Sequence, residues 1–198
     1  MKSKDYRDFL SQSCEENDCM ENARFGSIPS VPRPRQNMLW IVSDQQRAQS
    51  IAANGDPNVR TPNLDVMSRM GVNFNRAVSG FPICCPFRGT MLTGLYHHKC
   101  VPGHEYQLPP EQITVTDVFN ENGYDTAYFG KWHLDGCRRN PMLHVVPKER
   151  RGRFATWIGY ENNNSQWNTW VHGHTRDGEI EQYQLKGYET DALTDLLI

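Results

Sequence analysis

Short strand-like segments alternate with helix-like segments between residues 37 and 131 of this chain. Residues 37–42 form a continuous apolar run, which predicts a buried strand, and residues 72–78 alternate apolar and polar side chains, as a half-buried strand does. A third strand is expected at 124–129. The helices expected between these strands are 61–70, 84–93 and 114–122. This alternation predicts an α/β fold, in which helices flank a mostly parallel central sheet.

The composition argues against several classes of protein. The sequence holds 21 basic and 23 acidic side chains, a balance that gives no reason to expect a nucleic-acid surface or a polybasic membrane contact. No apolar run approaches the ~20 residues that a membrane-spanning helix needs. Residues 1–22 are charged and lack the apolar centre of a secretory signal. A cytoplasmic location is therefore expected, with the six cysteines mostly reduced.

The two ends of the chain differ from its centre. Residues 1–36 form a leader that ends in a proline-broken stretch, so an extended arm is expected before a domain that occupies 37–198. Residues 157–187 are aromatic, Asn-rich and charged, and they predict long surface loops. The last residues, 190–198, read as a capped amphipathic helix without a C-terminal stop signal. We therefore expect the domain to be incomplete at its C-terminus and this chain to be the first part of a longer protein.

Polar clusters follow two of the predicted strands. Asp44 and Gln45 come directly after the first strand, and Lys131 and His133 come after the third. Ligands of an open α/β sheet collect beyond the carboxyl ends of its strands. The oxygens of Asp44 and Gln45 suit a hard divalent cation. Lys131 and His133 supply donors that can stabilise an anion or protonate a leaving oxygen.

A cysteine motif opens the helix expected at 84–93. It reads Cys-Cys-Pro-Phe-Arg, and Cys84, but not Cys85, has a proline two residues later and an arginine, Arg88, four residues later. Backbone N–H groups at a helix N-terminus favour an anion, and Arg88 adds a charged donor. With the polar clusters, this motif completes what hydrolysis of a dianionic ester requires: positive charge for the anion, a nucleophile, and an acid for the leaving oxygen.

The ordered set of these segments resembles an arylsulfatase-type sulfatase of the alkaline phosphatase superfamily. The segments that carry the resemblance are 37–45, 61–74, 84–94 and 130–134. Together they cover roughly residues 37–160. The resemblance implies a sulfatase-like α/β fold and hydrolysis of a small-molecule sulfate ester.

The resemblance also implies a role for each motif residue. Cys84 would be converted to formylglycine by a formylglycine-generating enzyme, and its hydrated form would attack sulfur. The sulfated enzyme would then collapse back to the aldehyde. Asp44, Gln45 and the modified Cys84 would hold a divalent metal, usually calcium, with Mg²⁺ or Mn²⁺ as alternatives. The residues implied to be catalytic, through contacts with the diol or the sulfate, are Cys84, Arg88, Lys131 and His133.

The sequence departs from the family pattern in ways that leave the reaction open. Gln45 replaces the commoner second aspartate, as in some relatives that act on phosphonate or phosphate esters, and Phe87 replaces a small residue. The family's second metal-ligand pair, further lysine and second histidine normally come after the point where this chain ends. A phosphonate monoester or phosphodiester hydrolase therefore stays open as an alternative, as does a truncated, catalytically incomplete fragment.

Other candidate residues have simpler explanations. His172 and His174 form an H-x-H pair in a polar stretch, and we expect both on the surface. Three tryptophans are expected to pack under the long loops rather than to line a substrate pocket. A zinc site drawn from the central cysteines and histidines is disfavoured, because their spacings match no common zinc pattern. The tryptophans are Trp157, Trp167 and Trp170, and the zinc candidates are Cys84, Cys85, His97, His98, Cys100 and His104.

Overall fold

The computed structural model describes residues 35–198, and the chain divides into two units, Met1–Val42 and Ser43–Ile198. Of the first unit only residues 35–42 are described, so the predicted arm, 1–36, lies almost wholly outside the described residues. The second unit carries every helix and strand of the described part. None of these helices is long and apolar enough to cross a membrane.

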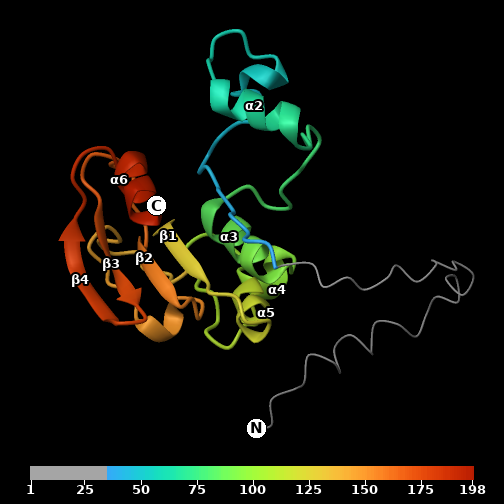
Figure 1. Cartoon of the computed structure of the whole chain (residues 1–198). Helices are drawn as coiled ribbons and strands as arrows, with labels where there is room; N and C mark the ends of the chain where they lie inside the picture. Colours follow the sequence, from blue (N-terminus) through green and yellow to red (C-terminus); the bar gives the residue numbers. More distant parts are fainter. Residues whose placement is uncertain (1–34) are drawn as a thin grey trace, which may run out of the picture. The chain divides into compact units, whose positions relative to one another are not determined.

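A four-stranded sheet forms the centre of the second unit (Figure 1). Its strands lie in the order of the sequence: β1 (Ala127–Lys131), β2 (Thr156–Tyr160), β3 (Trp170–Thr175) and β4 (Gly178–Gln184). β1 and β2 pair in parallel, because the long segment 132–155 crosses over before β2 begins. β2, β3 and β4 pair antiparallel. The predicted α/β class is confirmed, but the sheet of the described residues is mixed rather than mostly parallel.

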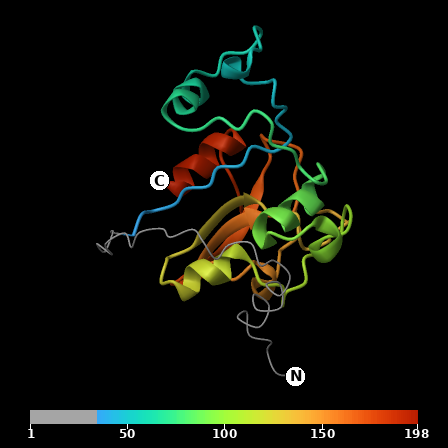
Figure 2. The same ribbon diagram turned by 90° about the vertical axis from the view of Figure 1, so that its right-hand side faces the viewer.

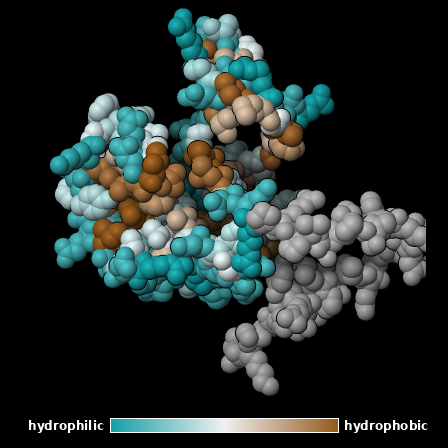
Figure 3. Space-filling view, in the orientation of Figure 1, coloured by the Kyte–Doolittle hydropathy of each residue, from teal (hydrophilic) through white to brown (hydrophobic). Residues whose placement is uncertain are grey.

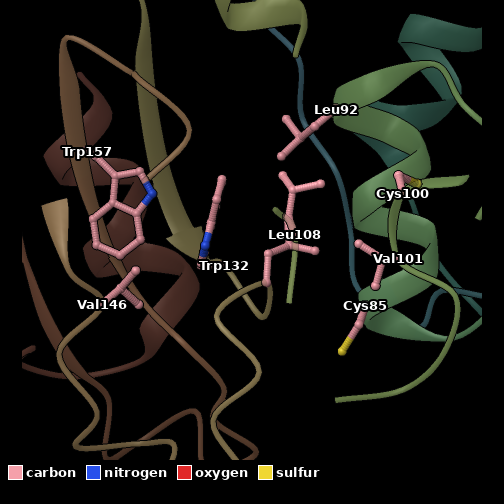
Figure 4. Close-up of a cluster of buried hydrophobic side chains, with 9 residues drawn as sticks. Cys85, Leu92, Cys100, Val101, Leu108, Trp132, Val146 and Trp157 are labelled. Carbon is pink, nitrogen blue, oxygen red and sulfur yellow. The ribbon is translucent and has the colours of Figure 1, made fainter. Parts of the chain in front are cut away.

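Helices cover both faces of this sheet (Figures 1 and 2). Successive side chains of a strand point to opposite faces, so Trp157 and Ile158 of β2 belong to different buried clusters. Trp157 shares its cluster with side chains of α3 (Cys84–Thr93) and α4 (His97–Cys100) (Figure 4). Ile158 shares the other cluster with α6 (Glu189–Leu197). The sheet therefore separates two cores, and α3 lies over the face that Trp157 fills.

The helices expected from local signals are confirmed. They are α2 (Pro62–Met70), α3, α5 (Val115–Glu121) and the C-terminal α6. The short α4 and two 3₁₀ helices, η1 (Ala52–Asn54) and η2 (Lys148–Arg150), were not predicted. Thr114 is the N-cap of α5, and its side chain forms a capping box with Asp117. α3 ends at Gly94, which adopts the left-handed conformation with φ of 70°. Caps and glycine stops act within a few residues, so the sequence could predict these elements directly.

Two of the predicted strands are wrong. Residues 37–42 and 72–78 form no strand in the described part of the chain, and their apolar side chains are exposed, with Ile41 72% and Val78 91% accessible. The third predicted strand is confirmed as β1, although it begins later, at Ala127. A strand exists only where a neighbouring strand pairs with its backbone groups, and the described sheet begins at β1.

Apolar side chains also reach the surface elsewhere in the second unit. Met67 and Met70, both in α2, are exposed. In the orientation of Figure 1, further apolar side chains gather around the end of α6 and beside α3 (Figure 3). Leu197 and Ile198, at the end of α6, are among the exposed ones. These faces are apolar but not covered by other described residues.

The prediction of long surface loops over 157–187 is wrong, because β2, β3 and β4 occupy most of this segment. Trp157 is completely buried, Trp170 is half-buried in β3, and Trp167 is exposed. The expected packing of the tryptophans therefore holds for Trp157, but under helices rather than loops.

The prediction that His172 and His174 lie on the surface is also wrong. Both are buried in β3, where His172 is 1% and His174 5% exposed. The Nε2 atom of His172 accepts a hydrogen bond from the Val146 backbone N–H at 2.8 Å. His174 contacts Arg151 through Nδ1 at 3.0 Å and the Phe154 carbonyl oxygen through Nε2 at 2.9 Å. The pair therefore holds the crossover segment against the sheet.

His172 should make the protein sensitive to mild acid. Burial, together with the nearby charges of Arg151 and His144, lowers the pKa of His172 to about 4, with Glu179 opposing this shift. Because the folded-state pKa of His172 is lowered, the unfolded protein takes up a proton at this histidine more readily than the folded protein does. The stability that the neutral histidine contributes is therefore fully present at pH values above its unfolded pKa of about 6.5, and it is lost as the pH falls toward 4. Between pH 6.5 and 5 the expected loss is about 2 kcal/mol.

Thermal unfolding at pH 7 and pH 5 measures this effect. We expect the Tm to fall in acid for the unaltered protein and to fall less for His172→Gln, which keeps a hydrogen-bond acceptor. The exposed His98→Gln is the matched control and should behave like the unaltered protein. An equal acid-induced fall in His172→Gln would contradict the prediction.

Candidate active site

Four of the predicted site residues come together from three segments far apart in the sequence. Asp44 lies in a turn at the start of the second unit, and Lys131 is the last residue of β1. Cys84 is the first residue of α3, and Arg88 lies about one turn later on the same helix face. The end of β1 and the beginning of α3 therefore carry the cluster, as expected for the carboxyl end of a strand in an α/β fold.

The Lys131 ammonium group lies between Asp44 and Cys84. Its Nζ atom is 2.8 Å from Asp44 Oδ2 and 3.5 Å from Cys84 Sγ, to which it donates. The Cys84 thiol lies 3.8 Å from Asp44 Oδ1. Each of the three side chains thus contacts the other two.

Arg88 anchors α3 to the end of β1. Arg88 is only 7% exposed. Its Nη1 atom donates hydrogen bonds to the Tyr128 hydroxyl at 3.2 Å and to the Lys131 carbonyl oxygen. Its Nη2 atom reaches Asp44 Oδ2 at 3.5 Å. One guanidinium group therefore fixes both the backbone of Lys131 and the carboxylate that Lys131 contacts.

The cluster keeps Asp44 ionised. Partial burial opposes its charge, but hydrogen bonds and charges of Lys131 and Arg88 outweigh burial and lower the pKa of Asp44. Two cations therefore face one carboxylate, and the group has a net positive charge. Such an excess favours binding of an anion.

The adjacent cysteines have different surroundings. Neighbouring residues of a helix point about 100° apart, so Cys84 faces Lys131 while Cys85 enters the buried cluster under α3. Cys84 is partly accessible, whereas Cys85 is completely buried. Burial raises the pKa of the Cys85 thiol to about 11, with the backbone N–H of Glu105 opposing the shift. A reactive cysteine needs access and nearby positive charge, and only Cys84 of the two has both.

Gln45 and His133 are less closely associated with this cluster. Gln45 follows Asp44 directly and is exposed, with a left-handed backbone at φ 56°. His133 is also left-handed, at φ 52°, but it is 1% exposed and its Nε2 atom faces Glu105 Oε1 at 3.2 Å. Its ring therefore contacts Glu105 rather than Cys84 or Asp44. The structure brings together Asp44, Cys84, Arg88 and Lys131, but not His133.

Sequence reasoning missed two residues around the site, Tyr128 and Glu105. Tyr128, in β1, donates from its hydroxyl to the Lys131 carbonyl oxygen and so helps to fix the strand end. His104 and Glu105 lie in the segment after α4, where Glu105 Oε1 is 2.9 Å from His104 Nε2. The alternation within β1 could have identified Tyr128 as an inward-facing residue. No local signal indicated Glu105, because its partner His133 is distant in sequence.

The oxygen atoms of Asp44 and Gln45, at the start of the second unit, are ligands of the type that a hard cation prefers. Asp44 offers carboxylate oxygens and Gln45 an amide oxygen, and Ca²⁺ binds six to eight oxygen ligands in proteins. In this structure the Asp44 carboxylate faces Lys131 and Arg88. Asp44 and Gln45 are thus suited to form part of a site for a hard divalent cation, to which further oxygen ligands would have to be added.

The chain is similar to known sulfatases over most of its length. The sulfatase family model matches residues 36–198. The chain is 42% identical over 130 residues to the ulvan-active sulfatase of Formosa agariphila, which covers 64% of this chain and 24% of that protein. It is 34% identical over 103 residues to the uncharacterized sulfatase YidJ of Escherichia coli K12, covering 52% of this chain and 21% of that protein.

A solved structure agrees with these matches. A crystal structure of the sulfatase yidJ from Bacteroides fragilis superposes with a TM-score of 0.63 at 28% identity, covering 73% of this chain and 35% of that chain. The chain spans between about a fifth and a quarter of the length of the two curated relatives.

Proposed function

This chain belongs to the sulfatase family, and from that premise we propose that it hydrolyses sulfate esters with residue 84 as the nucleophile. The observation that carries the proposal is the position of the Lys131 ammonium group, 2.8 Å from Asp44 and 3.5 Å from Cys84. An accessible nucleophile beside fixed cations is the arrangement that attack on a bound dianion requires.

Each member of the cluster has a proposed task. Lys131 binds the sulfate group and orients it toward residue 84. Arg88 holds the end of β1 and adds positive charge at the group being transferred. Asp44 keeps the Lys131 ammonium group directed at residue 84. The role of His133 as a contact of the sulfate stays a prediction, because that contact requires its ring to turn from Glu105.

The proposal includes a modification and a metal. Cys84 has the proline and arginine spacing of the family motif, and its side chain is the accessible one of the adjacent pair, which supports its conversion to formylglycine. Asp44 and Gln45 would hold a divalent cation, for which we propose Ca²⁺. When bound, such a cation supplies positive charge that stabilises the developing charge on the transferred group.

We propose sulfated carbohydrate as the substrate class. The relative with 42% identity is an ulvan-active sulfatase. Gln45 stands in place of a second aspartate and so removes one negative charge from the proposed metal site. For this reason phosphonate and phosphate esters are included among the substrates to be tested.

Two measurements test the proposal. First, the protein is produced in a host with formylglycine-generating activity, and the peptide that contains residues 84–88 is analysed by mass spectrometry. We expect the mass of an aldehyde in place of the thiol at residue 84. An unmodified Cys84 would overturn the proposed nucleophile.

Second, turnover is compared for an aryl sulfate, ulvan, a phosphonate monoester and a phosphodiester. We expect sulfate release to be the fastest reaction. Hydrolysis of only the phosphonate or the phosphodiester would replace the sulfatase proposal by the alternative hydrolase.

A further inference from the structure

An exposed aromatic pair lies outside the cluster around Lys131. Trp167, in the loop between β2 and β3, is 72% exposed, and its ring centroid is 5.3 Å from that of Tyr188 at the start of α6. The two ring planes are inclined at 53°. Tryptophan and tyrosine are enriched where proteins bind partners and ligands, so an exposed pair of them is a candidate binding surface.

The loop that carries Trp167 is held in place by hydrogen bonds. The Asn163 side-chain amide donates to the Thr169 hydroxyl at 2.7 Å, and that hydroxyl donates to the Glu189 carboxylate. The Glu189 backbone N–H donates to the Gln166 carbonyl oxygen at 2.8 Å. The residues on both sides of Trp167 are therefore fixed against the start of α6. A ring that is already held in position loses little conformational freedom when a ligand binds to it.

The aromatic pair lies beyond the same strand ends as the candidate active site. Lys131 and Tyr160, the last residues of β1 and β2, are partners in the parallel register. The Tyr160 hydroxyl donates to the Glu189 carboxylate at 2.5 Å, and Glu189 directly follows Tyr188. The loop with Trp167 also begins where β2 ends. The pair and Lys131 therefore share the edge of the sheet at which ligands of an α/β fold collect.

Unpaired side-chain amides lie beside the aromatic pair. Asn164 and Gln166 are exposed and precede Trp167 in the same loop. Neither side chain hydrogen-bonds another residue within the described range, 35–198. Each amide offers a donor and an acceptor, which are the groups that sugar hydroxyls require. A pyranose ring has a face of C–H groups and a rim of hydroxyls, so an aromatic face with amides beside it is complementary to both parts.

We propose that Trp167 and Tyr188 form a subsite that stacks a sugar ring of the carbohydrate substrate beside the position of its sulfate group. This inference rests on the proposed function, because it takes carbohydrate as the substrate class. The face of an aromatic ring carries partial negative charge, which attracts C–H groups and not sulfate oxygens. The subsite therefore takes the sugar ring, while the sulfate lies at Lys131.

Such a subsite would act on affinity rather than on the chemical step. Trp167 is distant in sequence from residue 84 and makes the same contact with the sugar before and during the reaction. Binding that is equal in the ground state and the transition state lowers KM without raising kcat. A small aryl sulfate has no additional sugar ring, so it gains nothing from this contact.

A desulfated ulvan oligosaccharide tests the subsite without hydrolysis. The full chain is titrated with this oligosaccharide by calorimetry, at ligand concentrations up to the millimolar range. We expect Trp167→Ala to weaken binding by at least about fivefold, and Trp167→Tyr to keep most of the affinity. Trp167→Leu should behave like Trp167→Ala, because leucine is apolar but has no aromatic face.

Tyr96→Ala is the matched control for this titration. Tyr96 is also 72% exposed, but it precedes α4 and is not part of the segments that follow β1 and β2. Its replacement should leave the affinity unchanged. Absence of binding by the unaltered protein, or equal affinity in Trp167→Ala, would overturn the proposal. A dimer of the chain that dissociates in Trp167→Ala would also overturn it, by assigning the pair to a second copy.

Kinetics connect the subsite to the reaction. In Trp167→Ala, the ratio of kcat/KM for ulvan to kcat/KM for an aryl sulfate should fall by at least about fivefold, through a higher KM for ulvan. Tyr96→Ala should keep the ratio of the unaltered protein. Equal losses on both substrates would overturn the proposal. If the unaltered protein hydrolyses neither sulfate, the proposed hydrolysis fails, and the titration alone decides whether the subsite exists.

Discussion

Cys84→Ala is expected to abolish sulfate ester hydrolysis while the fold is retained. The substitution removes the atom from which the nucleophile is made, and loss of a covalent nucleophile typically lowers kcat by about 10⁴–10⁶-fold. Cys84 lies outside both buried clusters, so its side chain contributes little packing. Turnover of an aryl sulfate by the purified variant, with circular dichroism to verify folding, measures the effect.

Cys137→Ser is the matched control for that experiment. Cys137 is also a partly accessible free thiol, but it hydrogen-bonds the Arg139 carbonyl oxygen and has no contact with the cluster around Lys131. Its replacement should leave the rate unchanged. Activity of Cys84→Ala within a few-fold of the unaltered protein would refute residue 84 as the nucleophile.

Arg88→Ala is expected to lower kcat/KM by about 10²–10³-fold, equivalent to about 3–4 kcal/mol. The guanidinium group supplies positive charge beside the nucleophile and holds both the Lys131 carbonyl oxygen and Asp44. Arg88→Lys keeps one positive charge but cannot contact these partners together. We therefore expect an intermediate rate for the lysine variant.

Arg176→Ala is the control variant, which distinguishes loss of the Arg88 contacts from loss of an arginine elsewhere in the protein. Arg176 forms an exposed ion pair with Asp125 and should be replaceable without a change in rate. Since Arg88 is buried, thermal unfolding of each variant is measured alongside the kinetics. A folded Arg88→Ala protein with a normal rate would show that Arg88 is purely structural.

The sequence predicted helices better than strands, and the reason is the range of the interactions involved. The limits of α5 follow from Thr114 and the residues just after it, and those of α3 from the motif and Gly94. The strand expected at 37–42 depended on partners elsewhere in the chain, which apolar character cannot specify. Conversely, β3 was missed because His172 and His174 appeared polar, although the fold buries both.

The candidate site was predicted as a set of residue types but only partly as an arrangement. The spacing of Cys84 and Arg88 identified two members, and the polar ends of the predicted strands identified Asp44 and Lys131. The direction of the His133 side chain could not be read from sequence, because it depends on Glu105, which comes from a distant loop.

The left-handed backbone around the site has a consequence for engineering. Gln45, Glu105 and His133 all have positive φ values, and each pays about 1 kcal/mol or more for a conformation that glycine adopts freely. A library selected only for heat resistance should therefore accumulate glycine at the exposed Gln45, whereas at His133 the packing of the buried side chain opposes that change. Such a variant would be more stable but would lack the Gln45 amide, one of the proposed metal ligands. Selection for thermostability alone would thus erode the chemistry, so activity must be selected in the same round.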